Sequence, residues 1–250
     1  MAAFVDRVTR RFAIGAEERA FLERLQLHPV RVRRRRRIVH AGDRAEHAFV
    51  LMTGWAMSSS RSGDGAHQVR RLHFPGDLLA MPSIAMQHYA EDIETVSDAV
   101  ISPFPKRLLA DLFAMPRLTA IMYMFAQAER ITAGDRLANV GQNNAKARVA
   151  FLLLDVLHRL RSADHTVENR FYMHLTREQI ADFTGMTPVH ASRMWSALVD
   201  EGLIQCIGRT VTILDERALV DLSHYRDRDG DFDHQWLKLV EEQLDHAAHA

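Results

Sequence analysis

The sequence predicts an α+β fold in three parts: an antiparallel β-roll, a long helix and a C-terminal winged helix-turn-helix. Between Val30 and Pro105, short apolar or alternating runs are separated by Gly, Asp and Pro turns, which is typical of an antiparallel roll or barrel. From Arg117 to about Val140, the apolar residues follow a helical pattern. Beyond Leu175, two short helical patterns flank a glycine, and an alternating segment follows them.

The composition is that of an ordinary folded chain. Its 250 residues can form one large domain or two modest ones. Lys and Arg together number 32, as do Asp and Glu, so a contact with nucleic acid must come from a local patch. The single cysteine excludes a disulfide framework, a four-cysteine iron–sulfur cluster and a cysteine-rich zinc site. No apolar run approaches ~18 residues and no signal core opens the chain, so we expect a cytoplasmic protein without membrane contact.

The first 116 residues are expected to form a β-roll domain. Phe12 to Leu27 has helical periodicity, and Pro29 is expected to end that helix. Turn signals then separate the strands of the roll at Ala41-Gly42-Asp43, Thr53-Gly54, Ser62-Gly63-Asp64-Gly65 and Pro75-Gly76-Asp77.

Residues 117–142 are expected to form a dimerisation helix. Its first half is apolar nearly all round, whereas a lone helix in water should show one apolar stripe. A helix with two apolar faces packs on its own domain with one and on a partner with the other. The residues that we expect at a homodimer contact are Leu118, Ile121, Met122, Phe125 and Ala128.

Residues 143–225 are expected to form a DNA-binding domain. It opens with an amphipathic helix from Asn144 to Leu160, followed by a polar loop, Arg161–Asn169, and a short strand, Phe171–Leu175. The tail, residues 226–250, begins with an Asp/Arg-rich linker and ends in a predicted helix from Trp236 to Ala247. The sequence assigns no role to this tail.

Two capped helices are predicted inside this domain. Thr176 can cap the first helix, and Gln179 stands three residues later in a capping-box arrangement. Gly185 supplies a tight turn. Thr187 can cap the second helix, and Pro188 occupies its first position, where the missing N–H costs nothing.

The second helix is expected to face outward with small polar and basic residues. Its pattern buries Ala191, Trp195, Leu198 and Val199, and it leaves Val189, His190, Ser192, Arg193 and Ser196 available. Such a pair of helices forms a helix-turn-helix, whose second helix fits the major groove, about 12 Å wide. Alternation in Ile207–Leu214 around Gly208-Arg209 predicts a two-stranded wing. The alternative is an unspecialised helical hairpin.

The order and spacing of these motifs resemble the Crp/Fnr superfamily of bacterial transcription regulators along nearly the whole chain. The matching motifs are Gly42-Asp43, Leu51-x-x-Gly54, Pro75-Gly76-Asp77, the run Asn144-Ala-Lys-Ala-Arg-Val-Ala150, LTREQIADFTGMT, GLI and RTVTILD. The resemblance implies a cyclic-nucleotide-binding-like roll, a dimerisation helix and a winged helix-turn-helix. It also implies a homodimer on a two-fold symmetric duplex, with half-sites about one helical turn (~34 Å) apart, and a contact between the roll and RNA polymerase.

The resemblance also suggests which residues read bases. Arg193 is the best candidate for a guanine contact through its bidentate fork. Many family members carry a Glu where Val189 stands, and its loss removes a typical acceptor for cytosine. His190 and Ser192 are expected to take over part of the reading.

Other residues of the helix-turn-helix are better placed for phosphates. Thr176 and Arg177 open the first helix, and Thr187 opens the second, where free N–H groups and the positive end of the helix dipole favour anions. Cys206 follows the second helix and is either a redox-sensing thiol close to DNA or an inert, partly buried cysteine.

An effector site for cyclic nucleotide is not expected. Nucleotide-binding members hold the cyclic phosphate and ribose with a Gly-Glu-led loop and an Arg-Ser/Thr pair. The corresponding stretch here, Gly76 to Val96, contains no arginine, and Glu91 and Asp92 lie near where a phosphate would need a cation. We therefore expect no cofactor, with a cyclic-nucleotide-responsive regulator as the alternative.

An enzyme is the alternative from a different class. A cupin-like metalloenzyme would need a ligand set such as two histidines and a carboxylate. The roll contains His40, His47, His67, His73 and His88, but no His-x-His or His-x3-His pair occurs among them. We therefore expect no metal site and no catalytic residue.

The segment from Arg31 to Arg37 carries six arginines in seven positions. We expect it to lie on the first strand of the roll, away from the recognition helix. Because a strand alternates faces, five consecutive arginines cannot all line one DNA surface. A solvated sheet edge, with acidic partners such as Glu17, Glu18 or the tail aspartates, is the simpler interpretation. A secondary contact with flanking DNA or another protein is the alternative.

Overall fold

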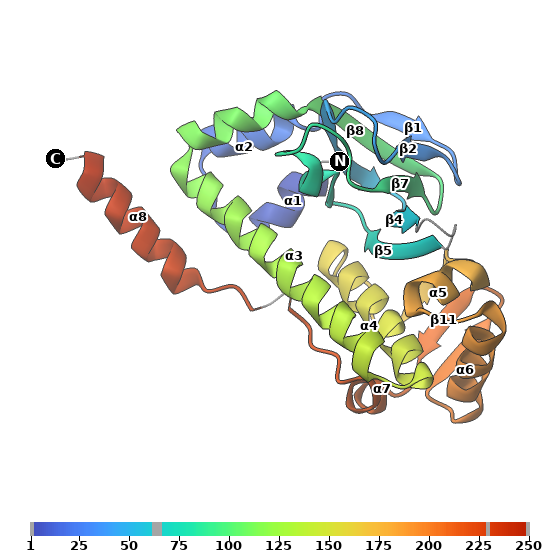
Figure 1. The fold of residues 1–250 in the computed structure, drawn as a ribbon. Helices are drawn as coiled ribbons and strands as arrows, with labels where there is room; N and C mark the ends of the chain where they lie inside the picture. Colours follow the sequence, from blue (N-terminus) through green and yellow to red (C-terminus); the bar gives the residue numbers. More distant parts are fainter. Residues whose placement is uncertain (1–2, 62–66, 229–230, 249–250) are drawn as a thin grey trace.

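The computed structural model describes residues 3–61, 67–228 and 231–248. Figure 1 shows a β-roll at one end of the molecule, a unit of helices and short strands at the other, and one long helix that connects them. The helices are α1 (Ala3–Thr9), α2 (Ala16–Arg24), α3 (Pro116–Gln142), α4 (Ala145–Ala163), α5 (Arg177–Thr184), α6 (Pro188–Asp200), α7 (Glu216–Ser223) and α8 (His234–Ala248). Two 3-10 helices, η1 (Met81–Ser83) and η2 (Lys106–Ala114), lie in and after the roll.

Two antiparallel four-stranded sheets form the roll, in the orders β1-β8-β3-β6 and β2-β7-β4-β5. The strands are β1 (Val30–Val32), β2 (Arg37–Val39), β3 (His47–Thr53), β4 (Ala56–Arg61), β5 (His67–His73), β6 (Leu78–Leu79), β7 (Asp92–Thr95) and β8 (Ala99–Pro105). Apolar residues of both sheets pack into one buried cluster, which confirms the predicted roll. Gly54 shows why a turn residue is needed, because a Cβ there would lie 2.3 Å from the Asp98 carbonyl oxygen. The turn signal Ser62–Gly65 lies outside the described residues.

The single N-terminal helix predicted from Phe12 to Leu27 is wrong. The chain forms two helices, α1 and α2, separated by residues 10–15. Gly15 is extended there, and its N–H donates to the Glu18 carboxylate over 2.7 Å, which starts α2 afresh. Phe12 is buried all the same, because the connecting segment folds it into the apolar cluster between α1, α2 and α3.

The arginine segment does not form one strand. β1 ends at Val32, residues 33–36 cross from one sheet to the other, and β2 begins at Arg37. The crossing is held by the Thr95 hydroxyl, which donates to the Arg33 carbonyl over 2.7 Å. Arg35 takes a left-handed conformation at φ 58°. The expectation that alternating strand faces separate these arginines is therefore wrong.

Helix α3 confirms the predicted long helix, which starts with Pro116 at its first turn. Leu118, Ile121 and Phe125 are buried against α1 and α2. The second half of α3 is tied to α4 by a buried ion pair, in which Arg136 lies 2.9 Å from Asp155. This one helix therefore contacts both ends of the molecule.

Helix α8 confirms the predicted tail helix and packs beside the first half of α3 (Figure 1). Leu237 is buried in the cluster that contains α1, α2 and the start of α3. Arg117 of α3 donates to Glu241 over 2.5 Å, and the rings of Tyr123 and Trp236 lie 6.2 Å apart. The tail, which the sequence left unassigned, thus belongs with the roll and α3.

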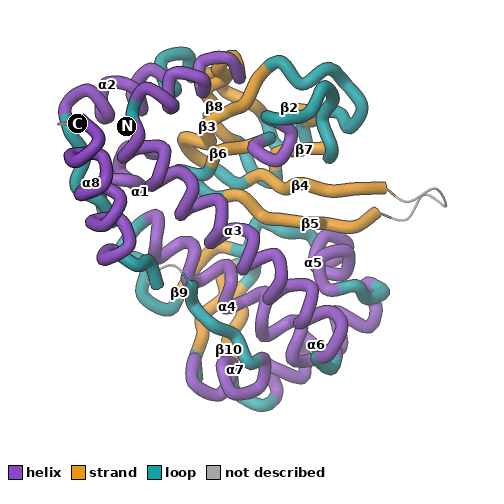
Figure 2. The backbone as a smooth tube through the Cα atoms, turned by 60° about the vertical axis from the view of Figure 1, so that its left-hand side comes forward, coloured by secondary structure: helices purple, strands orange, loops and turns teal. Residues whose placement is uncertain are grey.

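The roll and the C-terminal unit share one apolar cluster. Trp55, Leu72 and Phe74 of the roll belong to the same buried cluster as the core residues of α4, α5 and α6. Strand β5 runs alongside α5 (Figure 2). Burial of apolar surface across this junction favours one arrangement of the two parts.

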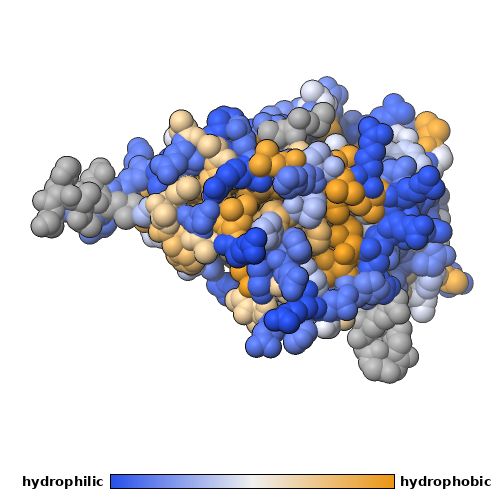
Figure 3. Space-filling view, turned by 90° about the horizontal axis from the view of Figure 1, so that it is seen from above, coloured by the Kyte–Doolittle hydropathy of each residue, from blue (hydrophilic) through white to orange (hydrophobic). Residues whose placement is uncertain are grey.

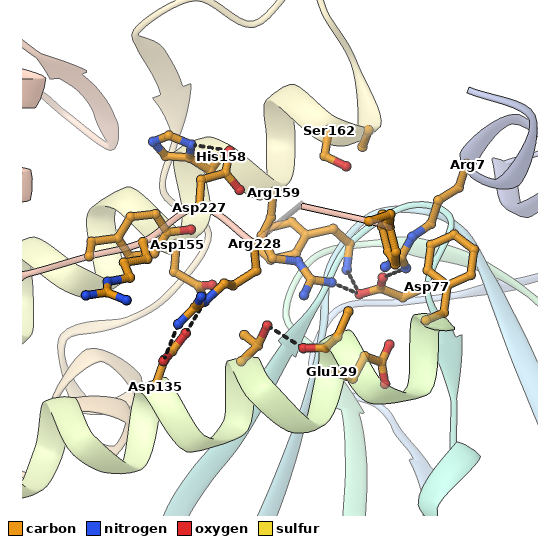
Figure 4. Close-up of a pocket in the computed structure, with 18 of the residues that line it drawn as sticks. Arg7, Asp77, Glu129, Asp135, Asp155, His158, Arg159, Ser162, Asp227 and Arg228 are labelled. Carbon is orange, nitrogen blue, oxygen red and sulfur yellow. Dashed lines mark hydrogen bonds and ion pairs between the residues drawn. The ribbon is translucent and has the colours of Figure 1, made fainter. Parts of the chain in front are cut away.

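A buried carboxylate reinforces the junction. Asp77, which follows the turn residue Gly76, is 1% exposed and receives hydrogen bonds from Arg7 of α1 and Arg159 of α4, the latter over 2.5 Å (Figure 4). Arg71 of β5 lies 3.6 Å away and donates to Glu129 of α3 over 2.5 and 2.7 Å. Side chains from α1, β5, α3 and α4 therefore converge on one network.

Electrostatics favour the ionised form of this carboxylate. Burial alone would raise the pKa of Asp77, but the guanidinium groups of Arg159, Arg7 and Arg71 outweigh it and hold the pKa well below its ordinary value. The backbone N–H of Phe74 also donates to the carboxylate over 3.0 Å. Asp77 is thus charged at neutral pH and paired on several sides.

Replacing the Asp77 carboxylate should destabilise the fold. We expect Asp77→Asn to lower the free energy of unfolding by about 3–5 kcal/mol, because it leaves buried cations without their partner. Urea denaturation would measure the loss in the free energy of unfolding.

The matched control is Asp111→Asn, whose exposed pair with Arg24 should contribute less than about 1 kcal/mol to the free energy of unfolding. Because the pKa of Asp77 is lowered in the folded state, its contribution is present above about pH 4 and is lost as the pH falls further. Equal losses in the two variants would contradict this assignment.

Candidate nucleic-acid interface

The first helix of the helix-turn-helix is capped as predicted. The Thr176 hydroxyl accepts a hydrogen bond from the Gln179 N–H over 3.2 Å, and the Gln179 side chain accepts one from the Thr176 N–H over 2.9 Å. Gly185 ends α5 in a left-handed conformation at φ 66°, and its N–H donates to the Ala181 carbonyl. The predicted glycine turn is therefore confirmed.

The second helix is also capped as predicted. The Thr187 hydroxyl accepts from the His190 N–H over 3.3 Å, and Pro188 is the first helical residue of α6. Ala191, Trp195 and Leu198 are buried, as expected. Val199 was expected to be buried as well, but it is 36% exposed. It lies one position beyond Leu198 and faces away from the buried stripe.

The outer face of α6 is available for contact. Val189 is 65% exposed, and His190 and Arg193 are exposed, whereas Ser192 is half-buried. Within the described part of the chain, the Arg193 guanidinium makes no hydrogen bond or ion pair. The four residues predicted to read bases thus lie together on the first turns of one helix.

Arg177 and Cys206 lie on the other side of α6, near Trp195. The Arg177 guanidinium stacks over the Trp195 ring, 4.3 Å from its centroid, and burial lowers the pKa of Arg177. The Trp195 indole N–H donates to the Cys206 sulfur over 3.2 Å. These three side chains join α5, α6 and the first strand of the wing.

The predicted wing is confirmed and has a third strand. β10 (Ile204–Ile207) and β11 (Thr210–Ile213) form the hairpin, and β9 (Arg170–Tyr172) pairs with β11. Arg209, at the hairpin turn, donates to the carbonyl oxygens of Met173, His174 and Leu175 over 3.0, 2.8 and 2.8 Å. This arginine therefore fixes the segment that leads into α5.

The arginine segment of the roll lies beside this same point. Arg34 donates to the Val96 carbonyl over 2.9 Å and to the His174 carbonyl over 3.3 Å. The segment therefore touches the loop that leads into α5, and the prediction that it lies away from the recognition helix, α6, stays a prediction. Among the described residues, no ion pair joins the segment to Glu17, Glu18 or a tail aspartate, and Glu18 pairs instead with Arg117 at 3.2 Å. No sequence signal marks the contact, because Arg34 and His174 lie 140 positions apart.

A hydrogen-bonded chain lies inside the roll and joins Glu91, from the Gly76–Val96 stretch, to Ser58 of β4 and His73 of β5. Glu91 is 8% exposed, and the Ser58 hydroxyl donates to its carboxylate over 2.9 Å. His73 Nε2 lies 2.6 Å from the same hydroxyl oxygen and must be the donor, because the hydroxyl proton is already used. Burial raises the pKa of Glu91 and lowers that of His73, so the imidazole is neutral.

Metal ligands do not gather in the described part of the chain: no group of three or more His, Cys, Asp or Glu side chains there is arranged to hold a metal ion. Nor does any helix among the described residues have the length and apolar character to cross a membrane.

Two family models match the chain. One, described as a cyclic nucleotide-binding domain, matches residues 29–115, and the other, described as a Crp-like helix-turn-helix domain, matches residues 147–222. Between them they cover more than half of the chain and include most of the roll and all of the helix-turn-helix with its wing.

Characterised relatives are regulators. The anaerobic regulatory protein of Haemophilus influenzae is 25% identical over 184 residues, which cover 73% of this chain and 71% of that protein. The fumarate and nitrate reduction regulatory protein of Escherichia coli K12 is 23% identical over 184 residues, 73% of each chain. The nitrogen fixation regulation protein FixK of Azorhizobium caulinodans is 27% identical over 177 residues, 70% of this chain and 71% of that protein. Among solved structures, FixK2 from Bradyrhizobium japonicum has the same fold, with a TM-score of 0.70 at 24% identity over 80% of this chain and 98% of that one.

A roll of the cyclic-nucleotide-binding type joined by a long helix to a winged helix-turn-helix defines a DNA-binding transcription regulator. The chain belongs to the Crp/Fnr superfamily of transcription regulators, and α5 and α6 are the helix-turn-helix of its DNA-binding domain.

Proposed function

We propose that this regulator binds a palindromic operator as a homodimer, with α6 of each subunit in the major groove. One observation carries the proposal: α6 buries Ala191, Trp195 and Leu198 and leaves an exposed face in which Arg193 has no partner among the described residues. A helix with both ends fixed and one polar, exposed face fits the groove of a duplex.

The role of each segment of the chain is part of this proposal. Residues 1–116 form the sensory roll, 117–142 the dimerisation helix, 143–225 the DNA-binding domain and 226–250 the tail. The bounds of α3 and the limits of the two family matches support these boundaries. The roll surface would contact RNA polymerase, and the chain would act without catalysis.

Within α6, Arg193 would read guanine through its two parallel N–H donors. His190 and Ser192 would contact neighbouring base edges, and Val189 would make an apolar contact, such as one with a thymine methyl group. Their common position on the first turns of α6 supports these roles.

Phosphate contacts would come from the starts of the two helices. Thr187 and Thr176 each hold the first turn of a helix whose N–H groups can meet a phosphate. Arg177 is adjacent, although its stacking on Trp195 already uses part of its surface. The contact between Trp195 and Cys206 supports a packing role for this cysteine over a redox role.

A first experiment selects bound DNA from a random pool and then measures binding of Arg193→Ala to the selected site. We expect binding to weaken by about 1–3 kcal/mol and the preference at one base pair to relax, because a bidentate base contact is lost. Arg107→Ala is the control, since Arg107 is an exposed arginine of the roll. A selected site without two-fold symmetry, or an unchanged base preference in Arg193→Ala, would contradict the proposal.

We propose a dimer contact on a different face of α3 from the one that the sequence indicated. Leu118, Ile121 and Phe125 pack inside the chain's own core and are not available to a partner, and Met122 and Ala128 are half-buried. The outer face carries exposed residues at alternating steps of three and four, as in a two-stranded coiled coil: Tyr123, Ala126, Arg130, Ala133 and Leu137. We propose that this stripe meets its counterpart on the second subunit.

Leu137, at 75% exposure, is more exposed than Tyr123, the other large hydrophobic side chain of that stripe. Leu137→Glu should weaken the dimer by at least about tenfold, because burying a leucine is worth ~1.5–3 kcal/mol and 1.4 kcal/mol is a factor of ten. Sedimentation equilibrium would measure the change. Leu27→Glu, which alters an exposed leucine between α2 and β1, is the control and should leave the dimer intact. A monomeric wild-type chain, or equal effects of the two changes, would contradict the stripe.

We also propose that the roll does not bind cyclic nucleotide. The buried Glu91 carboxylate, held by the Ser58 hydroxyl, would lie near the phosphate and repel it. Isothermal titration of the protein with cyclic AMP and with cyclic GMP should therefore give no saturable heat. A saturable signal with either nucleotide would instead support a cyclic-nucleotide-responsive regulator.

A further inference from the structure

Four arginines, one in β1 and three between β1 and β2, have side chains without a hydrogen-bond or ion-pair partner in the described part of the chain. The side chains of Arg31, Arg33, Arg35 and Arg36 are exposed, and none makes a hydrogen bond or ion pair with another described residue. Arg34 and Arg37 differ, because Arg34 donates to backbone carbonyls and Arg37 lies 3.9 Å from Asp92. In a chain of zero formal net charge, four unpaired cations in six positions form a strong local patch.

The patch is held in a fixed position. The backbone N–H of Arg34 donates to Asp98 over 2.8 Å, and that of Arg36 donates to the Thr95 hydroxyl over 3.0 Å. The guanidinium of Arg34 reaches across to the His174 carbonyl. The turn is therefore anchored both to the roll and to the segment that leads into α5.

This position adjoins the start of the helix-turn-helix. The His174 carbonyl accepts from Arg34 and also from Arg209 of the wing, and Thr176, the cap of α5, follows two residues later. The pKa of Glu178, in the first turn of α5, is lowered by hydrogen bonds from its own backbone and from Thr176, and further by the charge of Arg35. In Figure 3, the edge of the molecule on the side where β1 and β2 lie in Figure 1 is predominantly hydrophilic.

We propose that Arg31, Arg33, Arg35 and Arg36 form a second DNA contact, which binds phosphates of the duplex flanking the site read by α6. This inference rests on the proposed function. A duplex that lies against the first turns of α5 and α6 continues past them, and the arginine turn adjoins the start of α5. Guanidinium groups suit phosphate oxygens through paired N–H donors, and such contacts carry no sequence information.

DNA fits this patch better than an acidic protein does. The patch adjoins the end of α5 that we assign to phosphates, so one continuous polyanion could engage both surfaces. Arg31 lies in β1, whereas Arg33, Arg35 and Arg36 stand on the turn that follows it, so the alternation of strand faces does not separate these three.

The test compares Arg33→Gln/Arg35→Gln with the matched control Arg19→Gln/Arg107→Gln, which removes two exposed arginines from α2 and η2. Affinity is measured at several salt concentrations on two duplexes: the selected site alone, and the site extended by about one helical turn (~10 base pairs) at each end. Each lost phosphate contact should reduce the steepness of the fall in log affinity with log salt by ~0.9, so by ~3.6 for two contacts in each subunit of the homodimer. We expect this change only on the extended duplex, with base preference unaltered.

Each result bears on a different claim. The flanking contact is overturned if Arg33→Gln/Arg35→Gln has the same salt slope as the wild-type protein, or if the control variant changes the slope by the same amount. It is also overturned if the variant loses as much affinity on the short duplex as on the extended one. Because Arg31 and Arg36 belong to the same patch, Arg31→Gln/Arg36→Gln should reproduce the effect, and its failure to do so also overturns the inference. If the wild-type protein selects no site at all, the proposed function itself fails, which is a separate outcome.

Discussion

Asp77 is the buried charge on which the arrangement of this regulator depends. Its carboxylate follows a glycine turn of the roll and meets guanidinium groups from α1 and α4 (Figure 4). Arg71 of β5 also lies near it and carries the network on to α3. A charge removed from water in this way is stable only while its partners stay in place. The position of the DNA-binding domain relative to the roll is thus fixed by the same group that closes a turn of the roll.

A signal in the roll would have a short route to the DNA-binding domain. The chain of hydrogen bonds from Glu91 through Ser58 ends at His73, whose Nδ1 lies 4.0 Å from Asp77. From Asp77 the contact passes directly to Arg159 of α4. His73 Nδ1 makes no hydrogen bond to Asp77, so the polar chain inside the roll lies beside the ion pair that reaches the first helix of the DNA-binding domain and is not bonded to it.

Local patterns in the sequence predicted local structure well, but they did not predict contacts between residues far apart in the chain. The capping box at Thr176, the turn at Gly185 and the wing depend on neighbouring residues, and all were predicted correctly. The break at Gly15 was missed, because the apolar period continues through it. The buried and exposed faces of α3 and the contact between Arg34 and His174 could not be predicted either, since each depends on segments far away in the chain. The roles of the candidate residues in binding DNA stay predictions.

Helix α3 runs without interruption for 27 residues, which corresponds to a rod about 40 Å long. Its first half is packed against α1, α2 and α8, and its second half is paired with α4. Inserting one residue in the middle would rotate everything beyond it by about 100°, which would turn Leu137 out of line with Tyr123 and pull Arg159 of α4 away from Asp77 of the roll. An inserted heptad would nearly restore the angular alignment but would move the two ends ~10 Å further apart. Insertions in α3 can therefore change the spacing between the roll and the DNA-binding domain only in steps of about two helical turns.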